Sequence, residues 1–446
     1  MTADQPRPEP GPSRLVWTIA LPAMLTNVAT ALFGLADMWV IGRLGDAPAQ
    51  GAVELGAKFM MGLLIAFNFL RTGTVALTAQ AAGRSDVEEQ AATLLRALAA
   101  GLAIFVLLLA LRPLAIGFGL DMLEARGRVA EEAETYVRIR YWGAAPWLAS
   151  AVLGGWLIGQ RRVRSVLVVE VLANAIHIAL DFALVLWLGW GVAGVAVATL
   201  SSEAIKCAML AGFVVTVPAA SLLRERLRHA ATWDGGALKH LFALNRDLFL
   251  RTLLLTLAMM ILARSGAQRG PVILAANGIL FQLFMLSTLI LDGFESSSQV
   301  LCGEAKGSKD RTKFLSIVKV SLIWGNALGI VIALVYLGIG GALAASFSTD
   351  PQVAQTASSY SVWIMVLPVL GVTSFVLDGI FVGAAWTRAL LVTMVVAMAF
   401  YCAMLWFASP LDNHELWLAF SLFFVVRAAG QLALMPRLIR SGFSAS

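Results

Sequence analysis

Residues 163–187 read VRSVLVVEVLANAIHIALDFALVLW, and this run alone indicates the class of fold. A helix needs about 20 mostly apolar residues to cross a bilayer, and this run is longer than that. Four polar side chains interrupt it, at spacings of 4, 3 and 4 residues: Glu170, Asn174, His177 and Asp181. These spacings place all four on one face of an α-helix. The run therefore predicts a transmembrane helix that carries a polar stripe.

The whole chain has the composition of a membrane protein. Of its 446 residues, 59% are hydrophobic and 13% are charged, against roughly 25% charged residues in a soluble domain. The mean hydropathy is +0.81. A soluble fold with so few charges would expose more apolar surface than a monomer tolerates. This composition excludes a cytoplasmic enzyme, a nucleic-acid-binding domain and a disordered chain.

The same length criterion predicts an all-α polytopic membrane protein with twelve transmembrane helices. Lysine and arginine are concentrated in the even-numbered connections and at both termini. The positive-inside rule places that side in the cytoplasm, so both termini are predicted to be cytoplasmic. The predicted spans are 15–41, 56–82, 93–118, 135–160, 163–187, 191–217, 244–268, 271–301, 313–346, 354–384, 387–408 and 414–437.

The longest predicted connection divides the twelve spans into two lobes of six helices. It is rich in charged residues and is expected to form a short amphipathic cytoplasmic helix. The expected organisation is a cytoplasmic N-terminal tail (1–13), an N-lobe (14–217), this inter-lobe linker (218–243), a C-lobe (244–438) and a C-terminal tail (439–446).

A shift of 224 residues superimposes the second half of the sequence on the first. Because each half has an even number of spans, both copies begin on the same side of the membrane, which makes a parallel repeat. Transporters use this architecture, with the substrate path between two lobes that rock against each other. The matched pairs are Gly83 and Gly307, Asp86 and Asp310, Gly155 and Gly379, Gly159 and Gly383, and Arg164 and Arg388.

Two acids lie within the apolar spans of the first half only. Ionisable side chains at membrane depth cost roughly 2.5–3.5 kcal/mol on insertion scales, so they are functional candidates. Asp37 in the first span and Asp181 in the fifth both lie in the outer halves of their helices. The repeat places them on Ile261 and Leu405, so neither acid has an acidic counterpart. Two acids in a dry site repel each other, and a shared proton or cation relieves the repulsion.

These residues predict a proton or cation site in the N-lobe. For the stripe, the alternative is a buried seam of hydrogen bonds between helices. For Asp37, the alternative is an ion pair with Arg43 at the membrane interface. For Glu170, the first residue of the stripe, a further alternative is a position near the cytoplasmic headgroups. The predicted site comprises Asp37, Asp181, His177, Asn174 and Glu170.

Other polar side chains within the spans give weaker signals. Asn68 and Arg71 have polar counterparts in the second copy, which favours an inter-lobe or structural network. Asp378 lies near the cytoplasmic end of its span and is expected to form a gate or a packing contact. Arg427 needs an acidic partner that the sequence does not identify. Thr199 is of a type that bonds back to its own helix.

Short motifs are distributed from about residue 14 to 438. They are LPA at 21–23, LAD at 35–37 with GRLG at 42–45, NFLRTGT at 68–74 with AQA at 79–81, NRDLFLRT at 245–252, ILAAN at 273–277, LDGF at 291–294 and LDGIFVG at 377–383. This combination resembles the MATE (multidrug and toxic compound extrusion) family, and in particular its DinF branch. The resemblance implies twelve helices in two six-helix lobes, and antiport of cationic or amphipathic drugs against H+ or Na+.

The resemblance also implies a cation site made of Asp37, Asp181, Thr199 and the position four residues before Asp181. DinF-like proteins usually carry asparagine at that position, whereas this chain has His177. An imidazole can carry the proton itself near physiological pH, and when protonated it repels Na+. Glu170 likewise stands where glutamine is expected. These departures favour H+ as the coupling ion, with Na+ at Asp37, Asp181 and Thr199 as the alternative.

The predicted function is secondary active efflux of lipophilic or cationic compounds by alternating access, with no cofactor besides the coupling ion. The sequence has no Walker A, His-Glu-x-x-His or paired Asp-rich motif, so no enzymatic activity is expected. The protein is expected to work as a monomer in the bilayer of the inner membrane. Aromatic and apolar side chains suit flat lipophilic cations. The predicted substrate chamber includes Phe33, Met38, Trp39, Phe67, Asn68 and Arg71.

Two other functions remain open at this point. A flippase of lipid-linked precursors has a related architecture, but it needs a cationic chamber for a pyrophosphate, and the N-lobe stripe is acidic. A membrane-embedded transferase that uses His177 and Asp181 needs a substrate-phosphate or metal motif, and the sequence contains none.

Overall fold

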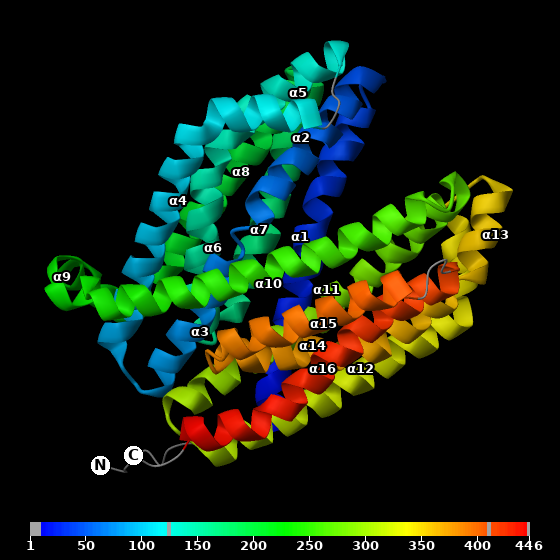
Figure 1. The fold of residues 1–446 in the computed structure, drawn as a ribbon. Coiled ribbons are helices and arrows are strands. Elements are labelled where there is room, and N and C mark those ends of the chain that lie inside the picture. The colour runs from blue at the N-terminus through cyan, green and yellow to red at the C-terminus, as the bar shows by residue number, and fades with distance from the viewer. Residues whose placement is uncertain (1–9, 123–125, 408–411, 444–446) are drawn as a thin grey trace. The chain divides into compact units, whose positions relative to one another are not determined.

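The structure is a computed structural model that describes residues 10–122, 126–407 and 412–443. Within these ranges, the side chains of residues 32–36 and 120–122 are not described. Helices account for almost all of the described residues, which contain no β-strand (Figure 1). The all-α fold class predicted from the sequence is therefore confirmed.

The helices pack into two compact units. The N-unit is Leu25–Leu253, and the C-unit combines the described chain up to Met24 with the chain from Leu254 onward. The division falls inside two helices, α1 (Pro12–Gly42) and α10 (Gly235–Ala267), so each of them contributes residues to both units. The lobes predicted from the sequence end instead at connections between helices.

The N-unit continues from α1 through a series of further helices. They are α2 (Ala47–Ile65), α3 (Phe69–Gly83), α4 (Val87–Met122), α5 (Gly127–Arg140), η1 (Tyr141–Gly143), α6 (Ala144–Gly159), α7 (Val163–Asp181), η2 (Phe182–Trp187) and α8 (Gly191–Val214). α2 packs on α5, α3 on α6 and α7 on α8. The last pair positions the polar stripe of the sequence.

The C-unit consists mainly of long helices. After α10 they are α11 (Pro271–Gly307), α12 (Arg311–Ser346), α13 (Pro351–Ser359), α14 (Val362–Gly383), α15 (Thr387–Phe407) and α16 (Asn413–Phe443). α14 lies against α11, α12 and α16, as Figure 1 shows. α14 is accordingly buried over most of its length, from Gly371 to Gly383 almost without interruption.

Ten helices of the described chain are long and apolar enough to cross a membrane. Two predicted spans are not among them. One is α1, whose side chains 32–36 are not described. The other is 135–160, which the short 3-10 turn η1 divides into α5 and α6. The predicted span 56–82 is also broken, by the turn at residues 66–68 between α2 and α3. When α1 and the span 135–160 are added to the ten, the arrangement is that of twelve helices in two lobes.

The linker predicted at 218–243 is shorter and less regular than expected. It contains η3 (Pro218–Leu222), the six-residue helix α9 (Leu223–Arg228) and η4 (Ala230–Trp233). Its last part already belongs to α10. The linker packs on α4, where Arg96 Nε donates to Thr232 O at 2.6 Å and Arg226 pairs with Glu88. These polar contacts join the linker to α4.

The backbone confirms the internal repeat. Among the residues that the structure describes, four non-glycine residues have positive φ and form two pairs that differ by 224 positions: Ser85 (56°) with Lys309 (57°), and Arg161 (60°) with Ala385 (55°). The helix caps correspond in the same way. Asp86 accepts from Glu89 N at 2.9 Å, and Asp310 accepts from Lys313 N at 2.8 Å.

Close helix packing repeats as well. A Cβ added at Gly155 would lie 2.6 Å from the backbone oxygen of Arg71, and one added at Gly379 would collide with the backbone oxygen of Glu295. Arg71 and Glu295 also differ by 224 positions. The absent side chains let α6 approach α3, and α14 approach α11, backbone to backbone. The two copies therefore share their geometry down to individual contacts.

Candidate functional site

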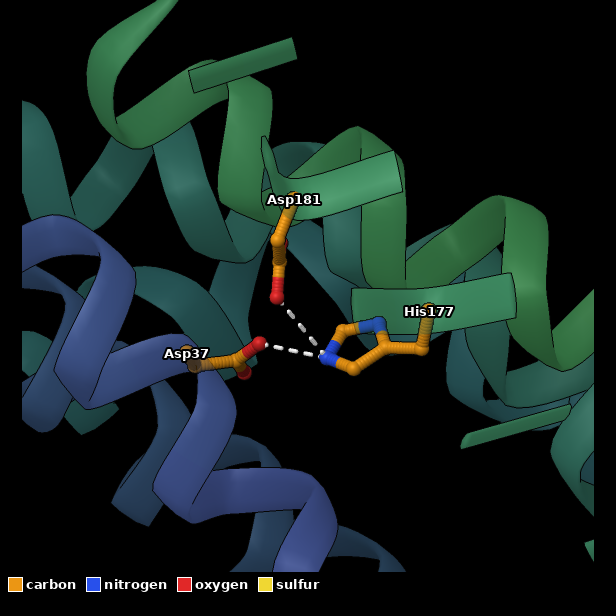
Figure 2. Close-up of side chains that lie close together, drawn as sticks. All are labelled: Asp37, His177 and Asp181. Carbon is orange, nitrogen blue, oxygen red and sulfur yellow. Dashed lines mark hydrogen bonds and ion pairs between the residues drawn. The ribbon is translucent and has the colours of Figure 1, made fainter. Parts of the chain in front are cut away.

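Three titratable side chains meet inside the N-unit. Asp37 reaches from α1 toward the imidazole of His177 on α7, and Asp181 points at the same nitrogen from the next turn of α7 (Figure 2). His177 Nε2 lies 2.7 Å from Asp37 Oδ1 and 3.1 Å from Asp181 Oδ2. The exposed fractions of Asp37, His177 and Asp181 are 5%, 0% and 0%. We call these three residues the acid–histidine cluster.

The local sequence explains how the cluster forms. His177 and Asp181 are four residues apart, which stacks them on one face of α7. Asp181 ends the regular α-helix, and the π-helical turn η2 follows it directly. Turns of this kind occur frequently at functional sites. Asp37 comes from another helix, 140 residues away from His177 in the chain. The sequence predicted all three residues, and the structure brings them together.

Hydrogen-bond donors and acceptors around the imidazole indicate its charge. Ser202 Oγ on α8 lies 2.9 Å from Thr199 O and 3.3 Å from His177 Nδ1. A hydroxyl has one proton, and the carbonyl can only accept. When Ser202 donates to Thr199 O, the ring nitrogen Nδ1 must donate to Ser202. Nε2 faces two carboxylates and must donate too. In that arrangement both ring nitrogens donate, Nδ1 to Ser202 and Nε2 to a carboxylate, and the imidazole carries a positive charge.

Asp181 has capacity for a further positive partner. Neither of its carboxylate oxygens accepts a well-oriented hydrogen bond within the described structure, and Oδ2 makes an ion-pair contact with His177. With both acids ionised, the cluster carries two negative charges against one imidazolium. A buried excess charge is costly unless a proton or cation compensates it.

The other predicted members of the site lie around the cluster without joining it. Asn174 Nδ2 donates to Glu170 O at 2.9 Å, along its own helix. Thr199 Oγ1 donates to Val195 O at 2.8 Å, also along its own helix. Arg43, the alternative partner for Asp37, stacks 4.5 Å over the ring of Trp39.

Glu170 belongs to a different group of charges. It is 4% exposed, and its carboxylate pairs with Lys206 of α8, with Nζ 3.0 Å from Oε2. Lys206, and Glu203 on the same helix, were not among the site residues predicted from the sequence. The signal was available, since both are charged residues in the predicted apolar span 191–217.

The predicted chamber residues are scattered over the N-unit. The side chain of Phe33 lies outside the described residues. Trp39 is 48% exposed and packs 5.5 Å from the ring of Phe182. Phe67 is half-buried and lies 6.1 Å from the ring of Phe69. The remaining candidates are Met38 and Arg71, which are half-buried, and Asn68, which is exposed just before α3.

The C-unit has its own buried polar group. Arg427 of α16 pairs with Asp378 of α14, which answers the question of its acidic partner. Gln431 Nε2 donates to the other oxygen of Asp378 at 2.7 Å. The guanidinium lies between the rings of Phe375 and Phe424, at 5.9 Å and 5.6 Å from their centroids. Aromatic faces favour a cation at such distances.

A bundle of helices long and apolar enough to cross a membrane, with a titratable cluster buried in one half, is typical of a transport protein. The MatE family model matches residues 22–183 and 248–406, which are the two copies of the repeat. The chain is 33% identical to the DNA damage-inducible protein F of Escherichia coli (strain K12) over 432 residues, 96% of this chain and 93% of that one.

Two further similarities extend this result. The chain is 25% identical over 349 residues to the probable multidrug resistance protein NorM of Thermotoga maritima, which covers 76% of this chain and 72% of that protein. The crystal structure of a MATE protein in the bent conformation matches with a TM-score of 0.88 over 98% of each chain, at 20% identity. The chain belongs to the MATE family of multidrug and toxic compound efflux transporters, and it is a multipass membrane protein.

Proposed function

We propose that this protein is a secondary active antiporter that exports lipophilic or cationic compounds in exchange for H+, with Na+ as the alternative coupling ion. Its place is the inner membrane, with both termini in the cytoplasm, and the monomer is the working unit. The acid–histidine cluster carries the proposal, because it is buried, titratable and short of positive charge. No enzymatic step is needed.

Coupling follows from competition for the same negative charge. When the cluster holds its proton, Asp37, His177 and Asp181 are close to neutral together and attract a cation only weakly. When the proton leaves, the excess negative charge draws a cationic compound into the N-unit. Each ligand lowers the affinity for the other, and this reciprocity is what an antiporter requires. Alternating access then exposes the two states to opposite sides.

The donor set favours H+ over Na+. Sodium is a hard cation that prefers several oxygen ligands, as calcium and magnesium do. The cluster offers carboxylate oxygens from Asp37 and Asp181, but His177 Nε2 already occupies the space between them. Thr199, the remaining oxygen of the implied sodium site, uses its hydroxyl in its own helix.

The two alternatives have less support. A flippase for a pyrophosphate-linked lipid needs excess positive charge, whereas the cluster has excess negative charge. A transferase that uses His177 and Asp181 needs a place for a phosphate or metal-bound donor, and His177 is enclosed between two carboxylates.

The test is transport by purified protein in proteoliposomes with ethidium as the fluorescent cation. An imposed pH gradient and an imposed Na+ gradient are applied separately and together. We expect the pH gradient alone to drive ethidium movement and the Na+ gradient to add little. Asp37→Asn serves as the coupling-deficient control. Movement driven by Na+ alone, with no response to the pH gradient, would overturn H+ coupling.

A further inference from the structure

A second group of charges lies on the same helices, seven residues before His177 on α7. That separation corresponds to about 10 Å along the helix axis. Here the carboxylate of Glu170 receives partners from two other helices. Lys206 Nζ of α8 lies 3.0 Å from Oε2 and 3.2 Å from Oε1, and Thr30 Oγ1 of α1 lies 3.0 Å from Oε1. The carboxylate thus binds an ammonium group in a largely buried setting.

Glu203 supplies a second carboxylate beside this pair. It precedes Lys206 by three residues on α8, which places both on one face. It is 7% exposed, and its Oε2 accepts no hydrogen bond within the part of the chain that the structure describes. A buried oxygen without a donor is a place where an N–H group of a ligand would be accommodated. Two arginines lie within electrostatic range: Arg140 attracts Glu203, and Arg71 repels Lys206.

Lys206 is the more exposed partner of its ion pair with Glu170. Its side chain is 17% exposed, whereas the side chain of Glu170 is 5% exposed. Lysine carries a hydrated point charge on a flexible four-carbon stem, whereas arginine makes a rigid, weakly hydrated fork. In the buried ion pair between Asp378 and Arg427, by contrast, both side chains are fully buried. The Glu170 pair is therefore the exchangeable one of these two.

We propose that Lys206 is a built-in competitor for a cation subsite formed by Glu170, Glu203 and Thr30, and that the subsite takes the protonated amine of a transported compound. Lys206 fills the subsite when it is empty and moves toward its exposed side when an amine enters. One ammonium replaces another, so the number of buried charges does not change and no additional charge must be desolvated. The inference rests on the proposed export of cationic compounds and narrows it to amines that carry N–H donors.

The test is equilibrium binding of doxorubicin, a fluorescent primary amine, to purified protein in detergent at fixed pH and fixed Na+. If Lys206 occupies the subsite about nine-tenths of the time, its removal makes binding about tenfold tighter. We expect this gain in Lys206→Met. The double variant Glu170→Gln with Lys206→Met should lose the gain, because the carboxylate that receives the amine is gone. Tetraphenylphosphonium, a cation without N–H groups, should gain less than doxorubicin in Lys206→Met.

Lys206→Gln provides a second variant that keeps hydrogen-bond donors for Glu170 and removes the charge. It should also bind doxorubicin more tightly than the parent protein. Unchanged or weaker doxorubicin binding in the lysine variants would overturn the proposal, as would an equal gain for tetraphenylphosphonium or no binding by any variant. The assay applies no gradient, so its result is independent of H+ coupling. The expected ranking in a protein without pH-driven transport would support the subsite and contradict the antiport mechanism.

Discussion

The two units contain buried polar clusters of opposite character. In the C-unit, Asp378 has a partner at each oxygen, Arg427 at one and Gln431 at the other. The guanidinium is charged at every physiological pH, so the pair keeps its charges. In the N-unit, Asp181 lacks well-oriented donors, and its neighbour His177 can gain or lose a proton. One cluster holds a fixed cation and the other contains a titratable imidazole, although both are built on copies of one fold.

The difference shows what the repeat reproduces and what it does not. Gly155 and Gly379, which differ by 224 positions, make the same close helix contacts. The chemistry differs at corresponding positions, because Arg427 falls on Glu203, and Asp37 falls on Ile261. The repeat therefore reproduces the packing of each unit, whereas the buried charged side chains differ between the two copies.

Loss of either acid in the N-unit should have the largest effect on transport. We expect Asp37→Asn and Asp181→Asn each to abolish pH-driven efflux, because an amide keeps the shape and cannot titrate. Membrane insertion and thermal stability should remain near those of the parent protein. Efflux from proteoliposomes measures the loss, with Asp292→Asn as a matched control whose counterpart Asn68 is already an amide. Equal loss in all three variants, at equal expression, would remove the asymmetry between the units.

The C-unit cluster should respond in stability rather than in coupling. Removal of one partner from a buried ion pair costs about 3–5 kcal/mol, because the other charge is left uncompensated. We expect Arg427→Met to lower the thermal stability of the purified protein strongly. The double variant Arg427→Met with Asp378→Asn should recover most of it. Efflux by the double variant should keep its dependence on the pH gradient, and loss of that dependence would show that the fixed cluster takes part in coupling.

The glycine pairs test whether the two units share their packing. A methyl group at Gly155 or Gly379 would meet a backbone oxygen of the facing helix. Overpacking of this kind costs about 1–3 kcal/mol. We expect Gly155→Ala and Gly379→Ala to destabilise the protein by similar amounts in thermal unfolding. A large effect at one position and none at the other would mean that the copies do not depend on the same contact.

His177→Asn should have the smallest effect and is the most specific probe of the coupling ion. The substitution restores the asparagine that the DinF-like pattern contains. We expect either new Na+ dependence or a shift in the pH optimum of efflux by about one unit, equivalent to roughly 1.4 kcal/mol. Efflux measured across a pH series, with and without Na+, distinguishes these outcomes from an unchanged profile. An unchanged profile would assign His177 to packing and leave the coupling proton to the carboxylates.

Much of this arrangement could be predicted from the sequence. The stripe on α7 stands out against an apolar background, and the matched glycines mark the repeat. The contact between Asp37 and His177 could not be derived, since it depends on how helices 140 residues apart pack together. Division of the units inside α1 and α10 leaves no compositional signal, because the apolar runs continue through it. Lys206 was missed although its charge was visible, and only the structure connects it with Glu170.

The central claim is that the acid–histidine cluster exchanges a proton for a cationic compound. Proton release on binding tests it most directly, with a pH-indicator dye in weakly buffered solution and tetraphenylphosphonium as the added cation. The account predicts release of about one proton per bound cation, since binding of each must weaken the other. Asp37→Asn and Asp181→Asn should bind without release. Cation binding by the parent protein without proton release, or equal release by both variants, would contradict the account.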